Sequence, residues 1–146
     1  MKNDYQVTFY KSELAQYNYI LDNDEIRSKI ADFLLKYVSV EAFYKKLLIL
    51  KKEQTEGKKL TEKDKKKLSV TASEVVSVLN HFGIVCESNL AERIFGSNDK
   101  NYMDCSIKKL RDRLVHRVNE NVLRIILERY DAINEDLDEF LKLFHV

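Results

Sequence analysis

The sequence predicts an all-helical protein. Its 146 residues include no proline and only three glycines. Ordinary proline usage of about five per cent predicts roughly seven prolines in a chain of this length. Because proline and glycine interrupt helices, this composition favours helical segments. Apolar residues also recur at steps of three and four in two long segments, which is the period of an amphipathic helix.

Length and composition predict one globular domain that spans residues 1–146. A chain of this size can bury a core without metal ions or disulfides. The N-terminus opens with polar residues, and no apolar run approaches the length of a membrane span. We therefore expect a cytoplasmic protein with no signal peptide and no membrane helix.

Charge and cysteine usage exclude few functions on their own. The chain has 25 basic and 24 acidic side chains, so a net charge of +1 neither favours nor excludes a nucleic-acid partner. Cys86 and Cys105 lack Cys-x-x-Cys spacing and are expected to be reduced thiols. No group of residues has zinc-ligand spacing, and there is no glycine-rich phosphate loop, so we expect neither a metal nor a cofactor.

Two helices are expected in the first third of the chain. Residues 4–20 carry a loose apolar face. Asp22 or Asp24 can cap a second helix that runs to about Glu53. Its apolar stripe consists of Ile26, Ile30, Phe33, Tyr37, Val40, Tyr44 and Leu47.

A third helix is expected to begin at Thr61. Thr61 and Asp64 have the spacing of a capping box, and the apolar pattern continues to Phe82. Gly83 is placed to end this helix.

Shorter helices should follow. Ser88 can cap residues 89–95, which Gly96 would end, and Asp104 can cap the next helix. The buried side of that helix is expected to be Ile107, Leu110 and Leu114.

The C-terminal segment has the clearest helical period in the chain. Asn119 is expected to mark a break or bend before it. Its stripe consists of Val122, Ile126, Tyr130, Ile133, Leu137, Phe140 and Phe144. Together the segments predict an antiparallel bundle of four to six helices.

Residues 51–67 form the only low-complexity segment. Gly57 interrupts a run of eight lysines, and four acidic residues partly offset their charge. We expect a hairpin tip between two helices. It is either a solvated, mobile loop or a contact for the RNA backbone.

The segment Leu110-Arg111-Asp112-Arg113-Leu114-Val115-His116 contains the strongest indication of chemistry. Cleavage of RNA without a metal ion requires one proton to leave the ribose 2′-OH and another to reach the departing 5′-oxygen. A histidine suits both tasks because its ordinary pKa lies near neutrality. The planar fork of an arginine can stabilise negative charge on the phosphorane oxygens.

The spacing of Arg111 and His116 raises a geometric question. Five residues on a straight helix rotate a side chain by about 500°, so the two would point roughly 140° apart. Either the helix is distorted near His116, or a second protomer completes the site. A two-fold dimer would bring two Arg–His pairs into one cleft and would supply both an acid and a base.

With this motif, residues 110–141 resemble the C-terminal half of a HEPN domain, most closely the HepT-type toxins of minimal-nucleotidyltransferase/HEPN pairs. That subgroup has an arginine, four residues, a histidine, one residue and a tyrosine. Arg111, Asp112 and His116 match this pattern, whereas Val118 stands in place of the tyrosine. The partner nucleotidyltransferase attaches AMP to that tyrosine, so Val118 puts this form of control in doubt.

The resemblance implies a helical homodimer with metal-independent endoribonuclease activity in a toxin–antitoxin or phage-defence system. Its partners would be RNA, a second copy of the chain, and a cognate antitoxin of the nucleotidyltransferase or another type. It gives Arg111 the role of phosphate stabiliser and His116 that of acid/base. Asp112 would orient Arg111 or the substrate. Each residue also has a non-catalytic interpretation. His116 would be a surface histidine, Asp112 would be solvated, and Arg111 would form an ordinary ion pair with Asp112 or Glu120.

Arg113, Arg117 and Arg124 fall with His116 near one helical face. This basic strip is a candidate RNA-binding surface, although nearby acidic residues can neutralise part of it. Tyr102 and Tyr130 are of a type that stacks on bases, but packing is the favoured interpretation for both.

Two further functional interpretations stay open beside the ribonuclease. One is a non-catalytic helical interaction module, such as a degenerate HEPN protein, a partner subunit or a regulator. The other is a HEPN domain that binds RNA or a nucleotide without cleavage. A ribonuclease would depend on both Arg111 and His116, whereas an interaction module would not. A HEPN domain that only binds RNA would leave the bound RNA intact.

Overall fold

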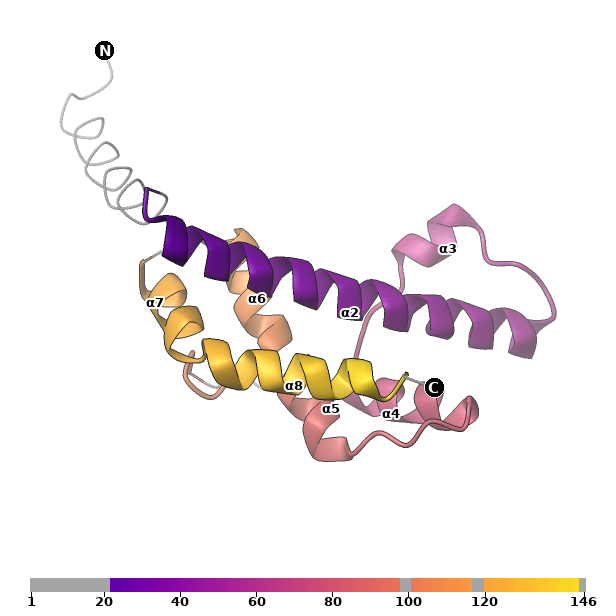
Figure 1. Cartoon of the computed structure of the whole chain (residues 1–146). Helices are drawn as coiled ribbons and strands as arrows, with labels where there is room; N and C mark the ends of the chain where they lie inside the picture. Colours follow the sequence, from indigo (N-terminus) through magenta and orange to yellow (C-terminus); the bar gives the residue numbers. More distant parts are fainter. Residues whose placement is uncertain (1–21, 98–100, 117–119, 145–146) are drawn as a thin grey trace, which may run out of the picture.

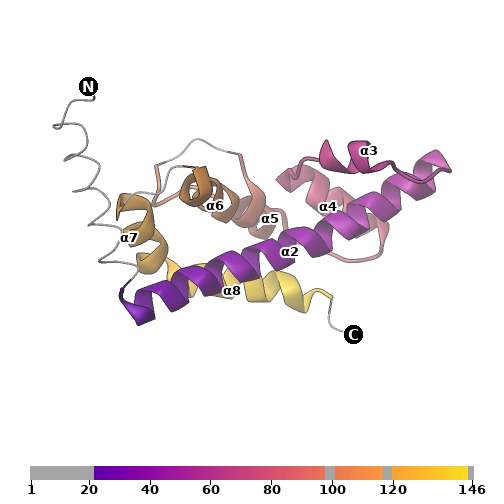
Figure 2. The ribbon, with the colours of Figure 1, turned by 90° about the horizontal axis from the view of Figure 1, so that it is seen from above.

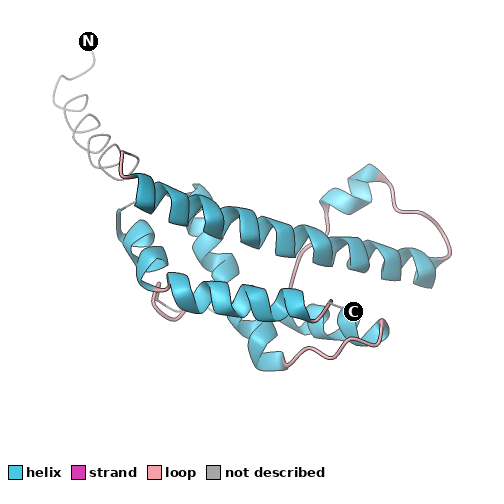
Figure 3. Ribbon diagram, in the orientation of Figure 1, coloured by secondary structure: helices cyan, strands magenta, loops and turns pink. Residues whose placement is uncertain are grey.

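A computed structural model describes residues 22–97, 101–116 and 120–144. Within these ranges the chain forms seven helices and no strand, which confirms the predicted all-helical class (Figures 1 and 3). The helix predicted at 4–20 lies outside the described residues. The helices are α2 (Asp24–Glu56), α3 (Glu62–Lys66), α4 (Ala72–His81), α5 (Ser88–Phe95), α6 (Ile107–His116), α7 (Glu120–Glu128) and α8 (Tyr130–Lys142).

Helix α2 is the longest described element and buries the middle of the predicted stripe. Ile26, Ile30 and Leu47 of that stripe are half-buried, and Leu48 is buried in place of Leu47. The predicted caps were wrong by one position, because the side chain of Asn23 accepts the bond from the N–H of Ile26 at 3.1 Å. The helix ends three residues beyond the expected Glu53, where Gly57 adopts a left-handed φ of 70°. Its fully buried side chains are Phe33, Tyr37, Val40, Tyr44 and Leu48.

The segment predicted as one helix from Thr61 to Phe82 is two helices. The capping box is present, since the hydroxyl of Thr61 accepts from the N–H of Asp64 and the Asp64 carboxylate accepts from the N–H of Thr61. Thr71 then caps α4 separately by accepting from the N–H of Glu74. A threonine that bonds to the backbone in this way competes with helix continuation, which explains the break. Gly83, with a φ of 75°, follows the end of α4 as predicted.

Helices α5 and α6 begin without the predicted caps. Helix α5 starts at Ser88 itself, and no side chain caps it. Helix α6 starts at Ile107 rather than after Asp104. The Ser106 hydroxyl accepts from the N–H of Lys109 at 3.2 Å and donates to the carbonyl of Gly96 at 2.6 Å. Ser106 therefore caps α6 and also ties its start to the end of α5.

The C-terminal stripe continues across a bend at Arg129. The predicted single helix divides there into α7 and α8, because Arg129 has a ψ of 4°. Its guanidinium donates to the carbonyls of Tyr102 and Cys105, each at 3.0 Å. Helix α6 ends at His116 and α7 begins at Glu120, but the predicted break at Asn119 itself lies outside the described residues.

Helices α2 and α8 lie side by side and run in the same direction (Figures 1 and 2). The hydroxyl of Tyr130 at the start of α8 donates to Asp32, and Phe144 beyond its end contacts the ring of Phe43. Residue numbers therefore rise together along both helices. This pair departs from the antiparallel arrangement expected from the sequence, because helices α3–α7 carry the chain back to the starting end of α2 before α8 begins.

Aromatic side chains occupy the centre of the core. The ring of Phe95 from α5 lies 6.3 Å from that of Tyr37, 5.9 Å from that of Tyr44 and 5.5 Å from that of Phe140. Rings at these separations and tilts interact favourably beyond their buried area. The short α5 thus joins the two long helices, and Tyr37 reaches from this core toward α6.

Candidate active site around Arg111

Helix α6 carries the motif on the side that faces away from the core. Ile107, Leu110 and Leu114 are buried, which confirms the predicted apolar side. Arg111 and Asp112 are half-buried on the flank, and His116 is exposed at the last residue of the helix. The amphipathic pattern therefore presents the three predicted catalytic residues outside the core.

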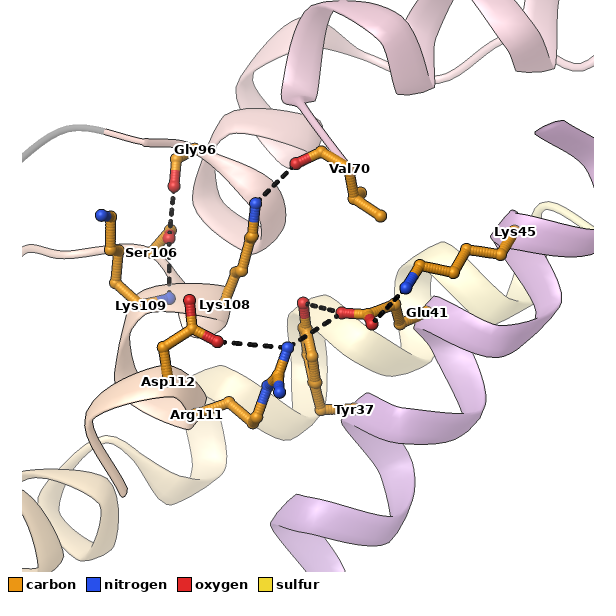
Figure 4. Close-up of polar contacts among 10 residues, drawn as sticks. All are labelled: Tyr37, Glu41, Lys45, Val70, Gly96, Ser106, Lys108, Lys109, Arg111 and Asp112. Carbon is orange, nitrogen blue, oxygen red and sulfur yellow. Dashed lines mark hydrogen bonds and ion pairs between the residues drawn. The ribbon is translucent and has the colours of Figure 1, made fainter. Parts of the chain in front are cut away.

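Arg111 is held by α2. Its Nη2 lies 3.3 Å from Oε2 of Glu41 and 3.1 Å from Oδ1 of Asp112, as Figure 4 shows. The guanidinium carbon lies 5.3 Å from the centre of the Tyr37 ring. Both ion pairs use Nη2, so Nη1 and Nε of the guanidinium take no part in them. Arg111 thus has a fixed place beside two carboxylates and an aromatic face.

Glu41 connects the residues around Arg111. It accepts a 2.6 Å hydrogen bond from the Tyr37 hydroxyl, and Lys45 lies 3.2 Å from its other oxygen. Burial by itself raises the pKa of Glu41, but the bonds from Tyr37 and Lys45 and the charges of Lys45 and Arg111 outweigh it and lower the pKa. Burial, followed by the hydrogen bond to Glu41 and then the charge of Glu41, raises the pKa of Tyr37. Glu41 is therefore the anion, and Tyr37 stays a neutral donor to it.

An open pocket of about 320 Å³ lies between α2, the segment 68–70 and α6. We call it the Arg111 pocket. Its lining residues are Glu41, Lys45, Leu68, Ser69, Val70, Lys108, Arg111, Asp112 and His116. All three predicted catalytic residues border this one pocket. The three residues after His116 lie outside the described ranges, so the predicted distortion stays a prediction.

Two arginines of the predicted basic strip, Arg113 and Arg124, do not line the Arg111 pocket. The guanidinium of Arg113 lies 4.6 Å from the centre of the Tyr102 ring, and Arg113 is not among the residues that line the Arg111 pocket. The exposed Arg124 on α7 donates to the side chain of Asn121 at 2.7 Å. Arg117 lies outside the described residues. The role of these arginines in RNA binding stays a prediction.

Sequence reasoning missed four residues of the site. Tyr37, Glu41 and Lys45 recur at steps of four and therefore share one side of α2, which is a readable signal. Their pairing with α6 is not readable, since Glu41 and Arg111 are 70 residues apart. Lys108, one turn before Arg111, is the fourth. Its Nζ donates to the Val70 carbonyl at 2.6 Å and ties the wall of the pocket to α6 (Figure 4).

Neither a metal cluster nor a membrane span is found in the described ranges. There, no group of three or more histidine, cysteine, aspartate or glutamate side chains is arranged to hold a metal ion. No described helix has both the length and the apolar character that crossing a membrane requires.

Comparisons with known proteins do not assign a family. Nothing matches among protein-family models, curated proteins or solved structures. What this protein does is therefore inferred from the Arg111 pocket and its residues.

Proposed function

We propose that this protein is a metal-independent endoribonuclease of the HEPN type. The observation that carries the proposal is the common pocket of Arg111, Asp112 and His116. Lys45 and Lys108 border the same pocket and add positive charge where a phosphate would bind. An anionic substrate, an arginine fork and a histidine are the groups that phosphodiester cleavage by internal attack requires.

In the proposed reaction the ribose 2′-oxygen forms a bond to the adjacent phosphorus as the bond to the 5′-oxygen breaks. A general base takes the 2′-OH proton, and a general acid gives a proton to the 5′-oxygen. The products are a 2′,3′-cyclic phosphate and a 5′-hydroxyl. His116 serves as acid or base, and Arg111 stabilises the equatorial oxygens. Glu41 and Asp112 act as positioning residues, because their ion pairs with Arg111 orient its fork.

We place the active unit in a homodimer of HEPN-like helical bundles. One protomer supplies one motif histidine, and the reaction moves two protons, so a second copy provides the missing acid or base. The exposed Val115 supports an interface close to His116. It directly precedes His116, and 55% of this apolar side chain is exposed.

The biological role we propose is that of a toxin or phage-defence effector that cleaves cytoplasmic RNA and is restrained by a cognate antitoxin. A nucleotidyltransferase could be that partner. AMP attachment at the position of Val118 is not part of the proposal, because valine has no hydroxyl to modify.

A non-catalytic interaction module is the second candidate. The two carboxylates on Nη2 of Arg111 favour it, since they satisfy the charge of the guanidinium within the fold. Under this candidate the motif is structural, and His116 is dispensable.

Induction in cells separates the two candidates. Wild type, His116→Ala and a matched His81→Ala control, at the end of α4, would be expressed at equal levels. The ribonuclease predicts growth arrest and RNA fragmentation with wild type and His81→Ala, and neither with His116→Ala. Arrest without RNA loss, or the same behaviour of all three proteins, would contradict it.

A further inference from the structure

Positive charge is concentrated in residues 51–67, which we call the lysine arm. The arm has eight lysines and four acidic residues, a net charge of +4. The whole chain has a net charge of +1, so the remainder carries −3. A nearly neutral protein thus has a strongly basic segment, which is the kind of local field that attracts a polyanion.

No residue of the lysine arm is fully buried, and local contacts shape it. Helix α3 within it has no buried residue. The arm is shaped by the left-handed Gly57, by the capping box of Thr61 and Asp64, and by a 2.8 Å bond from the N–H of Leu60 to the Glu53 carboxylate. Figures 1 and 2 show α3 standing beside the C-terminal part of α2, away from α7 and α8. Local backbone contacts rather than core packing thus position the part of the arm that follows Gly57.

The arm leads directly into the Arg111 pocket. Residues 68–70, which follow its last lysine, form one wall of the pocket, and the Lys108 bond to the Val70 carbonyl ties that wall to α6. Lys45, which precedes the arm on α2, also lines the pocket. Residues that line the pocket thus flank the arm in sequence on both sides.

The composition of the arm favours a nucleic acid over a membrane. A helix that lies on a lipid surface needs an apolar face to enter the headgroup region. Helix α3 reads Glu-Lys-Asp-Lys-Lys and has no apolar side chain. Contacts through charge alone are typical of proteins that follow a phosphate backbone irrespective of sequence.

We propose that the lysine arm is a docking surface for the phosphates of single-stranded RNA and guides the strand into the Arg111 pocket. This inference rests on the proposed function, because it takes RNA as the substrate of that pocket. In this proposal the arm increases the affinity for long RNA, and the residues of the pocket catalyse the cleavage step.

The test compares two variants that each remove two positive charges. The arm variant is Lys63→Gln with Lys66→Gln, and both lysines are exposed on α3. The control is Arg27→Gln with Lys29→Gln, near the opposite end of α2, a helix about 50 Å long at 1.5 Å per residue. The control residues form surface pairs with Asp24 and Glu25, which contribute little to stability, and Lys29 also lies 5.4 Å from the centre of the Tyr130 ring.

Binding would be measured over a range of salt concentrations with a labelled 2′-O-methyl RNA of about 16 nucleotides, a length that covers an extended binding site. This RNA has no 2′-OH, so it binds without being cleaved. Each lost phosphate contact lowers the salt slope by about 0.7 for a single strand. We expect the arm variant to lose about 1.4 in slope and roughly tenfold in affinity, and the control to match wild type.

Equal binding by the arm variant and the control would overturn the inference. So would tight binding of the wild type to phosphatidylglycerol vesicles that the arm variant loses while its RNA affinity is unchanged. Circular dichroism shows whether both variants keep the helical fold. Failure of the proposed function is distinguishable, because arm-dependent binding of the 2′-O-methyl RNA, together with unmodified RNA of the same sequence that stays intact with the wild type, would retain the docking surface and reject the nuclease.

Discussion

At the scale of single residues, Glu41 explains how a charged arginine is kept at the edge of the core. Arg111 and Glu41 have 24% and 17% of their side chains exposed, so neither charge is fully solvated. Each therefore depends on its partner, and Tyr37 and Lys45 complete the set around Glu41.

The first prediction concerns the removal of this counter-charge. Glu41→Gln keeps the size of the side chain but leaves Arg111 with the Asp112 pair alone. We expect the free energy of unfolding to fall by about 1–3 kcal/mol, as for a hydrogen-bonded, partly buried charge. Urea unfolding at neutral pH measures this. Lys46→Gln, an exposed position on the same helix, is the control and should change stability by less than about 0.5 kcal/mol.

The second prediction follows from the lowered pKa of Glu41. A carboxyl whose pKa is lower in the folded than in the unfolded protein stabilises the fold above its ordinary value of 4.5. That contribution is lost as the pH falls below 4.5 and through the lowered pKa. The difference in unfolding free energy between wild type and Glu41→Gln should therefore be largest near neutrality and shrink in acid. A difference that grows toward low pH would contradict this assignment.

At the scale of elements, the bend at Arg129 shows how one side chain divides a helix. The stripe from Val122 to Phe144 has an unbroken helical period, and backbone bonds into α7 and α8 continue at 2.9 Å on both sides of the bend. The Arg129 guanidinium meanwhile satisfies two carbonyls of the segment before α6. The bend thus couples the C-terminal helices to the start of the motif helix.

The third prediction tests that coupling. Arg129→Met keeps the length of the side chain but leaves the carbonyls of Tyr102 and Cys105 without their charged donor. We expect a loss of about 2–4 kcal/mol of stability, since bonds from charged donors contribute about 1.5–3 kcal/mol each and are not additive. Arg124→Met, on the exposed side of α7, is the matched control and should cost little. Thermal unfolding of both variants gives the comparison.

At the scale of the whole molecule, local helical patterns could be predicted from the sequence, whereas contacts between distant segments could not. Helical periodicity identified the buried sides of α2 and α6, and Gly83 and the Thr61 capping box identified helix ends. The separation of α3 from α4 was missed because Thr71 can either continue a helix or cap one. The direction of α8 along α2 and the Glu41–Arg111 pair depend on packing between distant segments, which periodicity does not encode.

The same limit applies to the candidate site. Arg111, Asp112 and His116 could be proposed from the sequence because they are near one another and resemble the spacing of the HEPN motif. Glu41, Lys45 and Lys108 became part of the site only when α2 and the segment 68–70 were seen against α6. The motif thus predicted the reacting groups of the proposed site, and the fold added the groups proposed to position them.

The fourth prediction tests the homodimer by subunit mixing. The proposed cleft needs the histidines of both protomers, one as acid and one as base. Exchange of the wild type with an excess of His116→Ala, by brief dilution and reconcentration, should place most wild-type protomers in mixed dimers that keep one histidine. RNA cleavage per wild-type protomer should then fall well below that of the wild type alone, whereas an equal excess of His81→Ala should not lower it. Cleavage that stays proportional to the wild-type protomers, although sedimentation shows mixed dimers, would argue that each protomer acts alone.

The most direct measurement of the central claim is cleavage of a purified, end-labelled RNA in the presence of EDTA. Wild type and the His81→Ala control should produce fragments with 2′,3′-cyclic phosphate and 5′-hydroxyl ends. His116→Ala and Arg111→Ala should each lose this activity by a hundredfold or more, as expected for a proton-transfer group and for a donor to the developing charge, whose removal typically costs about 10²–10⁴-fold and 10²–10³-fold. Intact RNA with the wild type, or equal cleavage by wild type and His116→Ala, would contradict the claim that the Arg111 pocket is a ribonuclease site.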